Sequence, residues 1–186
     1  MGDQVAEGLL SPFLRRQRIR AALPHLAGRV LDFGCGSGAL AACLPPERYC
    51  GVDIDPTSLR LARAAHPRHT FASAVPESRR GTFQTVVALA VIEHVADASG
   101  FLRELTGFLD DSPAARFVVT TPHPATERLH SLGSAWGIFS SEADQEHHSL
   151  LNRRTLSLAA APAGLKLSSY RRFLGGLNQL AIFQRG

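Results

Sequence analysis

Short apolar runs alternate with helical patterns along most of the chain, and this alternation is the first guide to its fold. Such alternation is typical of a mostly parallel sheet covered by helices. Because a short apolar run can be a strand or part of a buried helix, β-branched residues and flanking glycines or prolines decide between the two. The runs predicted to be strands are residues 29–33, 49–53, 69–72, 83–89 and 115–121.

Helices are expected before and between these strands. Residues 1–28 are expected to be mainly helical, because apolar residues recur there at helical spacing. Pro56 opens a helix that runs to about residue 65, since proline is favoured at the first helical position. Asp97 starts another helix, which runs to about residue 109.

The pattern changes after the fifth strand. Residues 122–151 lack a strong period and exceed the usual length of a connection, so they are predicted to form a lid or loop at an acceptor site. Asn152 can then cap a helix that stops near Gly164. Two strand-like runs, residues 165–174 and 177–184, are separated by two glycines, which predicts a hairpin and an antiparallel last strand.

These elements predict an α/β fold: a Rossmann-like, seven-stranded, mostly parallel sheet with an antiparallel last strand and helices on both faces. The 186 residues suit one domain over residues 1–186. No run approaches the roughly 20 apolar residues of a membrane span, and the first ten residues lack the basic flank of a signal peptide. The three cysteines suit a reducing compartment, so a soluble cytoplasmic protein is expected.

The balance of charge adds a modest constraint. Twenty basic residues against sixteen acidic ones give a net charge of +4, which permits an anionic substrate or a nucleic acid without requiring either. The dense basic cluster in the first helix is interpreted as a solvated face rather than an RNA-binding patch, because surfaces that follow phosphates usually also carry aromatic residues. Nucleic acid is therefore not expected as a partner. The cluster comprises Arg15, Arg16, Arg18 and Arg20.

The most specific signal is a run of glycines at alternate positions directly after the first predicted strand. Closely spaced glycines let the backbone turn sharply and let a ligand approach without a Cβ clash. Gly34 and Gly36, with Asp53 about twenty residues later, partly satisfy the dinucleotide fingerprint. An NAD-dependent oxidoreductase is therefore one alternative.

Two residues favour a different cofactor. Gly38 stands one position earlier than the third small residue of a pyrophosphate-binding turn. Asp32 places a carboxylate at the mouth of the turn, where it would repel a pyrophosphate and attract a cation. S-adenosyl-L-methionine carries an ammonium and a sulfonium and has no phosphate, so it suits this turn better than NAD does.

Several segments resemble class I S-adenosylmethionine-dependent methyltransferases, in the expected order along the chain. Residues 30–40 resemble motif I, and residues 51–55 resemble the end of the second strand of that family. Residues 83–95, ending Val-Ile-Glu-His-Val, resemble a stretch of the ubiquinone-biosynthesis-like, type 11/12 subgroup. Thr-Thr-Pro at 120–122 and Ala-Gly-Leu at 163–165 match two further segments. The resemblance covers roughly residues 25–185.

The resemblance implies a set of cofactor-binding residues. Asp32 would lie near the ammonium, Asp53 would accept both ribose hydroxyls with its two oxygens, and Ile54 would pack on the adenine. Ser73 stands where the family usually has an aspartate for the adenine amino group. Asp55 is expected to cap the next helix instead. The full set is Asp32, Gly34, Cys35, Gly36, Gly38, Asp53, Ile54, Ser73 and Ala90.

Methyl transfer from a sulfonium requires alignment above all, and it requires a base only if the acceptor must lose a proton. His94 follows the fourth strand at the ligand-binding edge and is the first candidate base, although it could equally cap a helix or line the pocket. His147 and His148 are the second candidates. Some relatives bind a divalent metal through two glutamates and a histidine. Because Ala90 replaces the first of these glutamates, no metal is expected.

The predicted function is methyl transfer from S-adenosyl-L-methionine to a small-molecule or glycan acceptor, with oxygen as the favoured nucleophile. Asp32 and Gly38 disfavour the NAD-dependent alternative. The missing adenine-binding aspartate suggests a third possibility, a non-catalytic protein that binds S-adenosylmethionine. The fold is shared by enzymes acting on many acceptors, so the fold alone does not choose the acceptor.

Overall fold

The computed structural model describes residues 3–124 and 151–186, with side chains from residue 12 onward. The helices are α1 (Asp3–Ala22), α2 (Pro56–Ala65), α3 (Ala98–Thr106) and α5 (Arg153–Ala160). The strands are β1 (Val30–Phe33), β2 (Tyr49–Val52), β3 (Thr70–Ala72), β4 (Thr85–Leu89), β5 (Arg116–Pro122), β6 (Leu165–Phe173) and β7 (Asn178–Arg185). Short 3-10 helices are η1 (Leu23–His25), η2 (Ala41–Cys43), η3 (Pro46–Arg48), η4 (Glu77–Arg79), η5 (Ile92–His94) and η7 (Ala161–Ala163).

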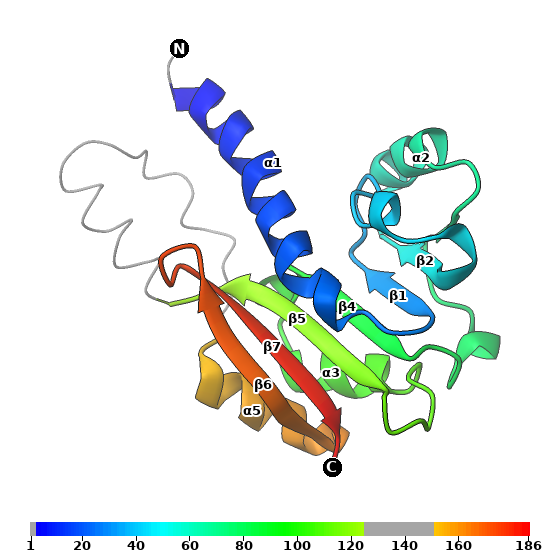
Figure 1. Cartoon of the computed structure of the whole chain (residues 1–186), viewed down its shortest axis with the longest axis vertical. Coiled ribbons are helices and arrows are strands. Elements are labelled where there is room, and N and C mark those ends of the chain that lie inside the picture. The colour runs from blue at the N-terminus through cyan, green and yellow to red at the C-terminus, as the bar shows by residue number, and fades with distance from the viewer. Residues whose placement is uncertain (1–2, 125–150) are drawn as a thin grey trace.

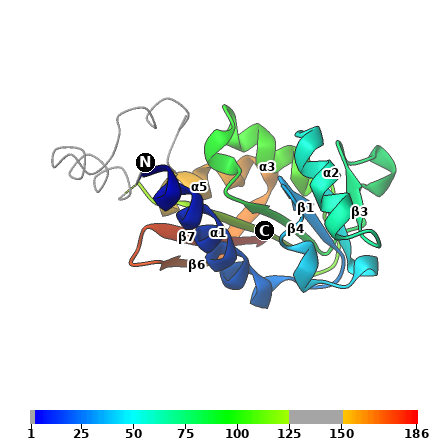
Figure 2. The same cartoon turned by 90° about the horizontal axis from the view of Figure 1, so that it is seen from above.

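These strands form one seven-stranded sheet in the order β3-β2-β1-β4-β5-β7-β6 (Figure 1). Strands β1 to β5 pair in parallel, whereas β7 runs antiparallel to both β5 and β6. The mostly parallel sheet with an antiparallel last strand is therefore confirmed. Figure 2 shows β3 and β6 at opposite ends of the sheet.

Helices cover both faces of the sheet, as the sequence predicts. Successive strand residues point to opposite faces, so each central strand contributes to two separate clusters. Leu31 and Val86 belong to the cluster that includes α3 and α5 side chains, whereas Val30 and Val87 belong to the one that includes α1 and α2 side chains. All four side chains are fully buried, as is typical of parallel strands covered on both faces.

The predicted boundaries agree with the structure to within a few residues. One difference concerns the helix expected over 97–109, which ends at Thr106. After Gly107 the chain turns, so that Phe108 and Leu109 are buried in the core. Phe83 makes only an isolated bridge to Leu109, so β4 starts two residues later than predicted.

Three polar residues cap helices at their amino-terminal ends. The carboxylate of Asp55 accepts hydrogen bonds from two backbone N–H groups of α2, and Asp97 accepts one from α3. The side chain of Asn152 accepts two from α5. Each cap satisfies backbone donors that have no partner within the helix, so all three predicted helix starts are confirmed.

The strand order places a crevice at the carboxyl ends of β1 and β4. The chain passes from β1 to β2 on one side and later returns to β4 on the other, so the connections diverge at this point. In open α/β sheets, ligands bind at such switch points. Over residues 3–124 and 151–186, no helix has both the length and the apolar character needed to cross a membrane.

A buried glutamine joins the two chain ends that flank the predicted lid. The side-chain amide of Gln179 donates to the carbonyl of Pro122 (2.9 Å) and to that of Leu151, and its carbonyl accepts from the Tyr170 hydroxyl (2.8 Å). Gln179 is 0% exposed, whereas Pro122 and Tyr170 are half-buried. The lid itself, apart from its ends, lies outside the described residues.

We expect Gln179→Ala to lower the free energy of unfolding by about 2–4 kcal/mol, because two carbonyls and a hydroxyl lose their partner together. Tyr170→Phe removes only one of these bonds and should cost about 1 kcal/mol. Urea unfolding at fixed pH measures both values. A loss for Gln179→Ala no larger than that for Tyr170→Phe would show that Gln179 does not hold the two chain ends.

Candidate active site

The turn after β1 is bound to the end of β2. The backbone N–H groups of Gly34 and Cys35 both donate to the Val52 carbonyl, at 2.8 and 3.0 Å. The N–H of Gly36 donates to Oδ2 of Asp53 at 2.7 Å. The other oxygen of Asp53 accepts from a backbone N–H two residues later, and each oxygen keeps a lone pair for a ligand hydroxyl.

Two glycines of the turn are required for different reasons. Gly34 and Gly36 both have φ in the left-handed region, at +77° and +53°. A Cβ at Gly34 would lie 2.4 Å from a Val91 methyl group, so this glycine is needed for packing inside the protein. A Cβ at Gly36 would meet no atom within 4 Å. Gly36 therefore faces open space, as expected where a ligand approaches the backbone.

Asp32 is a buried carboxyl group at the end of β1. It is 3% exposed, and its Oδ2 accepts a hydrogen bond from the Tyr49 hydroxyl at 2.7 Å. Burial raises the pKa of Asp32 to about 7; the Tyr49 hydrogen bond opposes this rise and the Asp53 charge adds to it. Burial, followed by the charge of Asp32, raises the pKa of Tyr49, which keeps the phenol protonated as the donor. Tyr49 carries no motif signal, and sequence analysis missed it.

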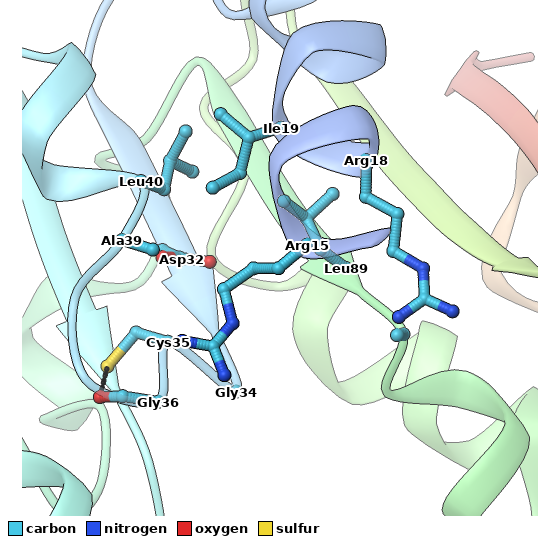
Figure 3. Close-up of a pocket in the computed structure, with 11 residues that line it drawn as sticks. Arg15, Arg18, Ile19, Asp32, Gly34, Cys35, Gly36, Ala39, Leu40 and Leu89 are labelled. Atoms are coloured by element: carbon cyan, nitrogen blue, oxygen red, sulfur yellow. Dashed lines mark hydrogen bonds between the residues drawn. The ribbon is translucent and has the colours of Figure 1, made fainter. Parts of the chain in front are cut away.

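A cavity of about 220 Å³ lies beside the turn, between α1 and the ends of β1 and β4 (Figure 3). Apolar side chains from α1, β4 and the segment after the turn form part of its wall: Ile19, Leu40 and Leu89. Five of the predicted cofactor residues line it: Asp32, Gly34, Cys35, Gly36 and Ala90. The structure therefore brings the glycine turn and the end of β4 together around one space.

The remaining predicted cofactor residues lie outside the cavity wall. Gly38 is buried beneath the turn, and a Cβ there would approach Phe71 to 3.1 Å. Asp53 lies at the end of β2, where its carboxylate holds the turn. Ile54 is 89% exposed although it is large and apolar. Ser73 is exposed after β3.

Two arginines of α1 also line the cavity, and the half-buried Arg18 corrects the interpretation of the whole basic cluster as a solvated face. Arg15 extends toward the glycine turn and Arg18 toward the end of β4 (Figure 3). Arg15 donates to the Ser37 hydroxyl at 3.4 Å. Arg15, Arg16 and Arg20 are exposed, so the original interpretation holds for these three. Positions 15 and 18 share one helix face because they are three residues apart.

The two ionisable residues of η5 differ in burial: Glu93 is buried and His94 is exposed. Glu93 is 2% exposed, and no residue in the described part of the chain forms a hydrogen bond with its Oε2. Burial raises the pKa of Glu93. The side chain of His94 is exposed at the same edge of the sheet. His147 and His148 lie outside the described residues.

Ala90 follows β4 with an unusual backbone conformation. Its φ is +59°, in the left-handed region, which costs a residue with a Cβ about 1–2 kcal/mol. Its N–H donates to the Thr120 carbonyl at 2.8 Å, so the neighbouring strand holds this geometry. Strained backbone of this kind is concentrated at functional sites.

Comparison with known proteins identifies the family. A family model described as a methyltransferase domain matches residues 8–170. A ubiquinone biosynthesis O-methyltransferase of Methylobacterium sp. (strain 4-46) is 39% identical over 90 residues, which cover 42% of this chain and 35% of the relative. A ribosomal protein L11 methyltransferase of Tolumonas auensis is 37% identical over 92 residues, covering 45% and 30%. The chain thus spans about a third of the length of these curated relatives.

A solved structure shares the fold along nearly its whole length. An S-adenosylmethionine dependent methyltransferase from Mesorhizobium loti superposes with a TM-score of 0.67 at 20% identity, covering 90% of this chain and 95% of the other. At this identity the likeness concerns the fold. Because the family model matches most of the chain, the protein belongs to the methyltransferase domain family, as the resemblance of its motifs to class I S-adenosylmethionine-dependent methyltransferases predicted.

Proposed function

We propose that this domain transfers a methyl group from S-adenosylmethionine to an oxygen atom of a small-molecule or glycan acceptor. The observation that carries the proposal is the cavity beside the glycine turn, where Asp32, Gly36 and Arg15 converge. Family membership favours this function over the NAD-dependent alternative. The Methylobacterium relative is named as an O-methyltransferase, which supports oxygen as the acceptor atom.

The residues around the cavity fit the chemical groups of this cofactor. Asp32 can neutralise an ammonium, Arg15 can bind a carboxylate, and Asp53 can accept from a vicinal diol. The exposed Ile54 offers an apolar surface to an adenine ring. In place of the usual aspartate, Ser73 offers one hydroxyl to the adenine amino group.

When bound, S-adenosylmethionine supplies a methyl group already activated on a sulfonium. The chain then has to hold donor and acceptor in line and to exclude water. Ile19, Leu40 and Leu89 give the cavity an apolar wall on one side. His94 stands at the same edge of the sheet and can take the proton that a hydroxyl acceptor loses.

We expect Asp53→Ala to weaken S-adenosylmethionine binding by about 1.5–3 kcal/mol, the usual contribution of hydrogen bonds to a charged group. Isothermal titration calorimetry measures the change. Asp55→Ala is the matched control, because it removes a carboxylate two residues away that only caps α2. This control should cost about 1 kcal/mol of folding stability and leave cofactor affinity unchanged. Unchanged affinity in a folded Asp53→Ala protein would exclude Asp53 as the ribose ligand.

Cofactor affinity should depend on pH through Asp32. In the protein without cofactor, the pKa of Asp32 is about 7. An adjacent ammonium favours the ionised form of this carboxyl, so cofactor binding should strengthen as the pH rises through 7. If only the ionised form binds, affinity increases about tenfold between pH 6 and pH 8. Calorimetry at several pH values tests this, with Asp32→Asn as the variant whose profile should be flat. A flat profile in the unmodified protein would place the ammonium elsewhere.

Activity itself is tested with methyl-labelled S-adenosylmethionine and a panel of phenols, hydroxy acids and glycosides. For the best acceptor, His94→Ala should lower the single-turnover rate by about two to four orders of magnitude, with cofactor affinity unchanged. The comparison is the double variant His147→Ala, His148→Ala. If only the double variant loses activity, the base lies in the predicted lid. Cofactor binding without transfer to any acceptor would favour the non-catalytic alternative.

A further inference from the structure

We propose that Arg18 binds a carboxylate of the methyl acceptor and thereby determines acceptor specificity. The inference rests on the function proposed above, because it concerns the same cavity. It goes further by naming the chemical class of the acceptor, a hydroxylated carboxylic acid. Three observations support it: how the Arg18 side chain is held, which partners are absent among the described residues, and where the side chain points.

The guanidinium of Arg18 is held in place by a buried amide. Its Nε donates to Oδ1 of Asn178 at 3.0 Å, and Asn178 is only 4% exposed at the start of β7. This bond occupies one edge of the guanidinium. Within the described part of the chain, neither of its two Nη groups donates to a protein acceptor. Two donors of known orientation are therefore available to a ligand.

Among the described residues, no carboxylate lies within 4 Å of the Arg18 guanidinium. The ion pairs in that part of the chain are Arg80–Glu77 and Arg185–Asp111. Burial lowers the pKa of Arg18, and Glu93 opposes this through space without forming an ion pair. A partly buried cation without a direct partner is costly. A ligand carboxylate would offset that cost by accepting from both Nη groups.

The position of Arg18 separates it from the proposed cofactor groups. In Figure 3, Arg15 reaches over the glycine turn, whereas Arg18 reaches toward Leu89 and the end of β4. S-adenosylmethionine has one carboxylate, for which Arg15 is the better placed partner beside the turn. Arg18 is then left for the second ligand of the cavity, which is the acceptor.

The test compares two probes that differ in charge, 3,4-dihydroxybenzoate and 3,4-dihydroxybenzamide. Both are titrated into the full chain saturated with S-adenosylhomocysteine, the demethylated cofactor. We expect the acid to bind the unmodified protein at least about tenfold more tightly than the amide, as a charge-assisted hydrogen bond predicts. Arg18→Ala should abolish this preference, and Arg18→Lys should keep part of it. Arg16→Ala, which removes an exposed arginine of the same helix, should leave it intact.

Cofactor titrations separate the failure of this inference from that of the proposed function. If the unmodified protein does not bind S-adenosylmethionine, the proposed function fails. If every variant binds S-adenosylmethionine, three results overturn the role of Arg18 and leave the proposed function standing. They are equal affinity for the two probes, no binding of either probe, and a preference that survives Arg18→Ala. An affinity for S-adenosylmethionine that falls as much in Arg18→Ala as in Arg15→Ala also overturns it, because Arg18 would then serve the cofactor.

Discussion

The hydrogen bond from the Gly36 N–H to the Asp53 carboxylate is the contact on which the site depends. It joins the turn after β1 to the end of β2, next to the two bonds that the Val52 carbonyl accepts. A glycine turn has many accessible conformations, and these bonds select one of them. The same bond fixes the orientation of the Asp53 carboxylate, so one contact determines both the shape of the turn and the position of this side chain. The part of the cavity wall that the turn forms, residues 34–36, follows from this geometry.

The site keeps ionisable groups in places where burial disfavours their charge. The pKa of Asp32 is raised from 3.8 to about 7, so the folded state holds its proton more tightly than the unfolded state does. The contribution of Asp32 to the free energy of unfolding therefore falls as the pH rises through that interval. A cationic ligand reverses the effect, because it stabilises the ionised carboxylate and binds only the folded state. Perturbed groups of this kind cluster at functional sites.

Most of the fold and part of the site could be predicted from the sequence, and the rest could not, for a physical reason. Strands, helix caps and the glycine turn are encoded locally, so their positions follow from periodicity and residue type. Arg18 and Tyr49 act through partners distant in sequence, on β7 and β1. Helical periodicity shows that the α1 arginines share a face with one another. It does not show that the sheet places part of that face over a cavity.

The first two residues of β7 connect Arg18 with the flanks of the predicted lid. Adjacent strand residues point to opposite faces of a sheet. Asn178 accordingly binds Arg18 of α1, and Gln179 binds the carbonyls of Pro122 and Leu151. Both side chains are buried, so a shift of β7 would disturb the arginine and both chain ends together. The carboxylates proposed to bind the cofactor lie instead at the carboxyl ends of β1 and β2. On the proposal made above, substitutions at Arg18 and Asn178 change acceptor specificity while the cofactor turn stays the same.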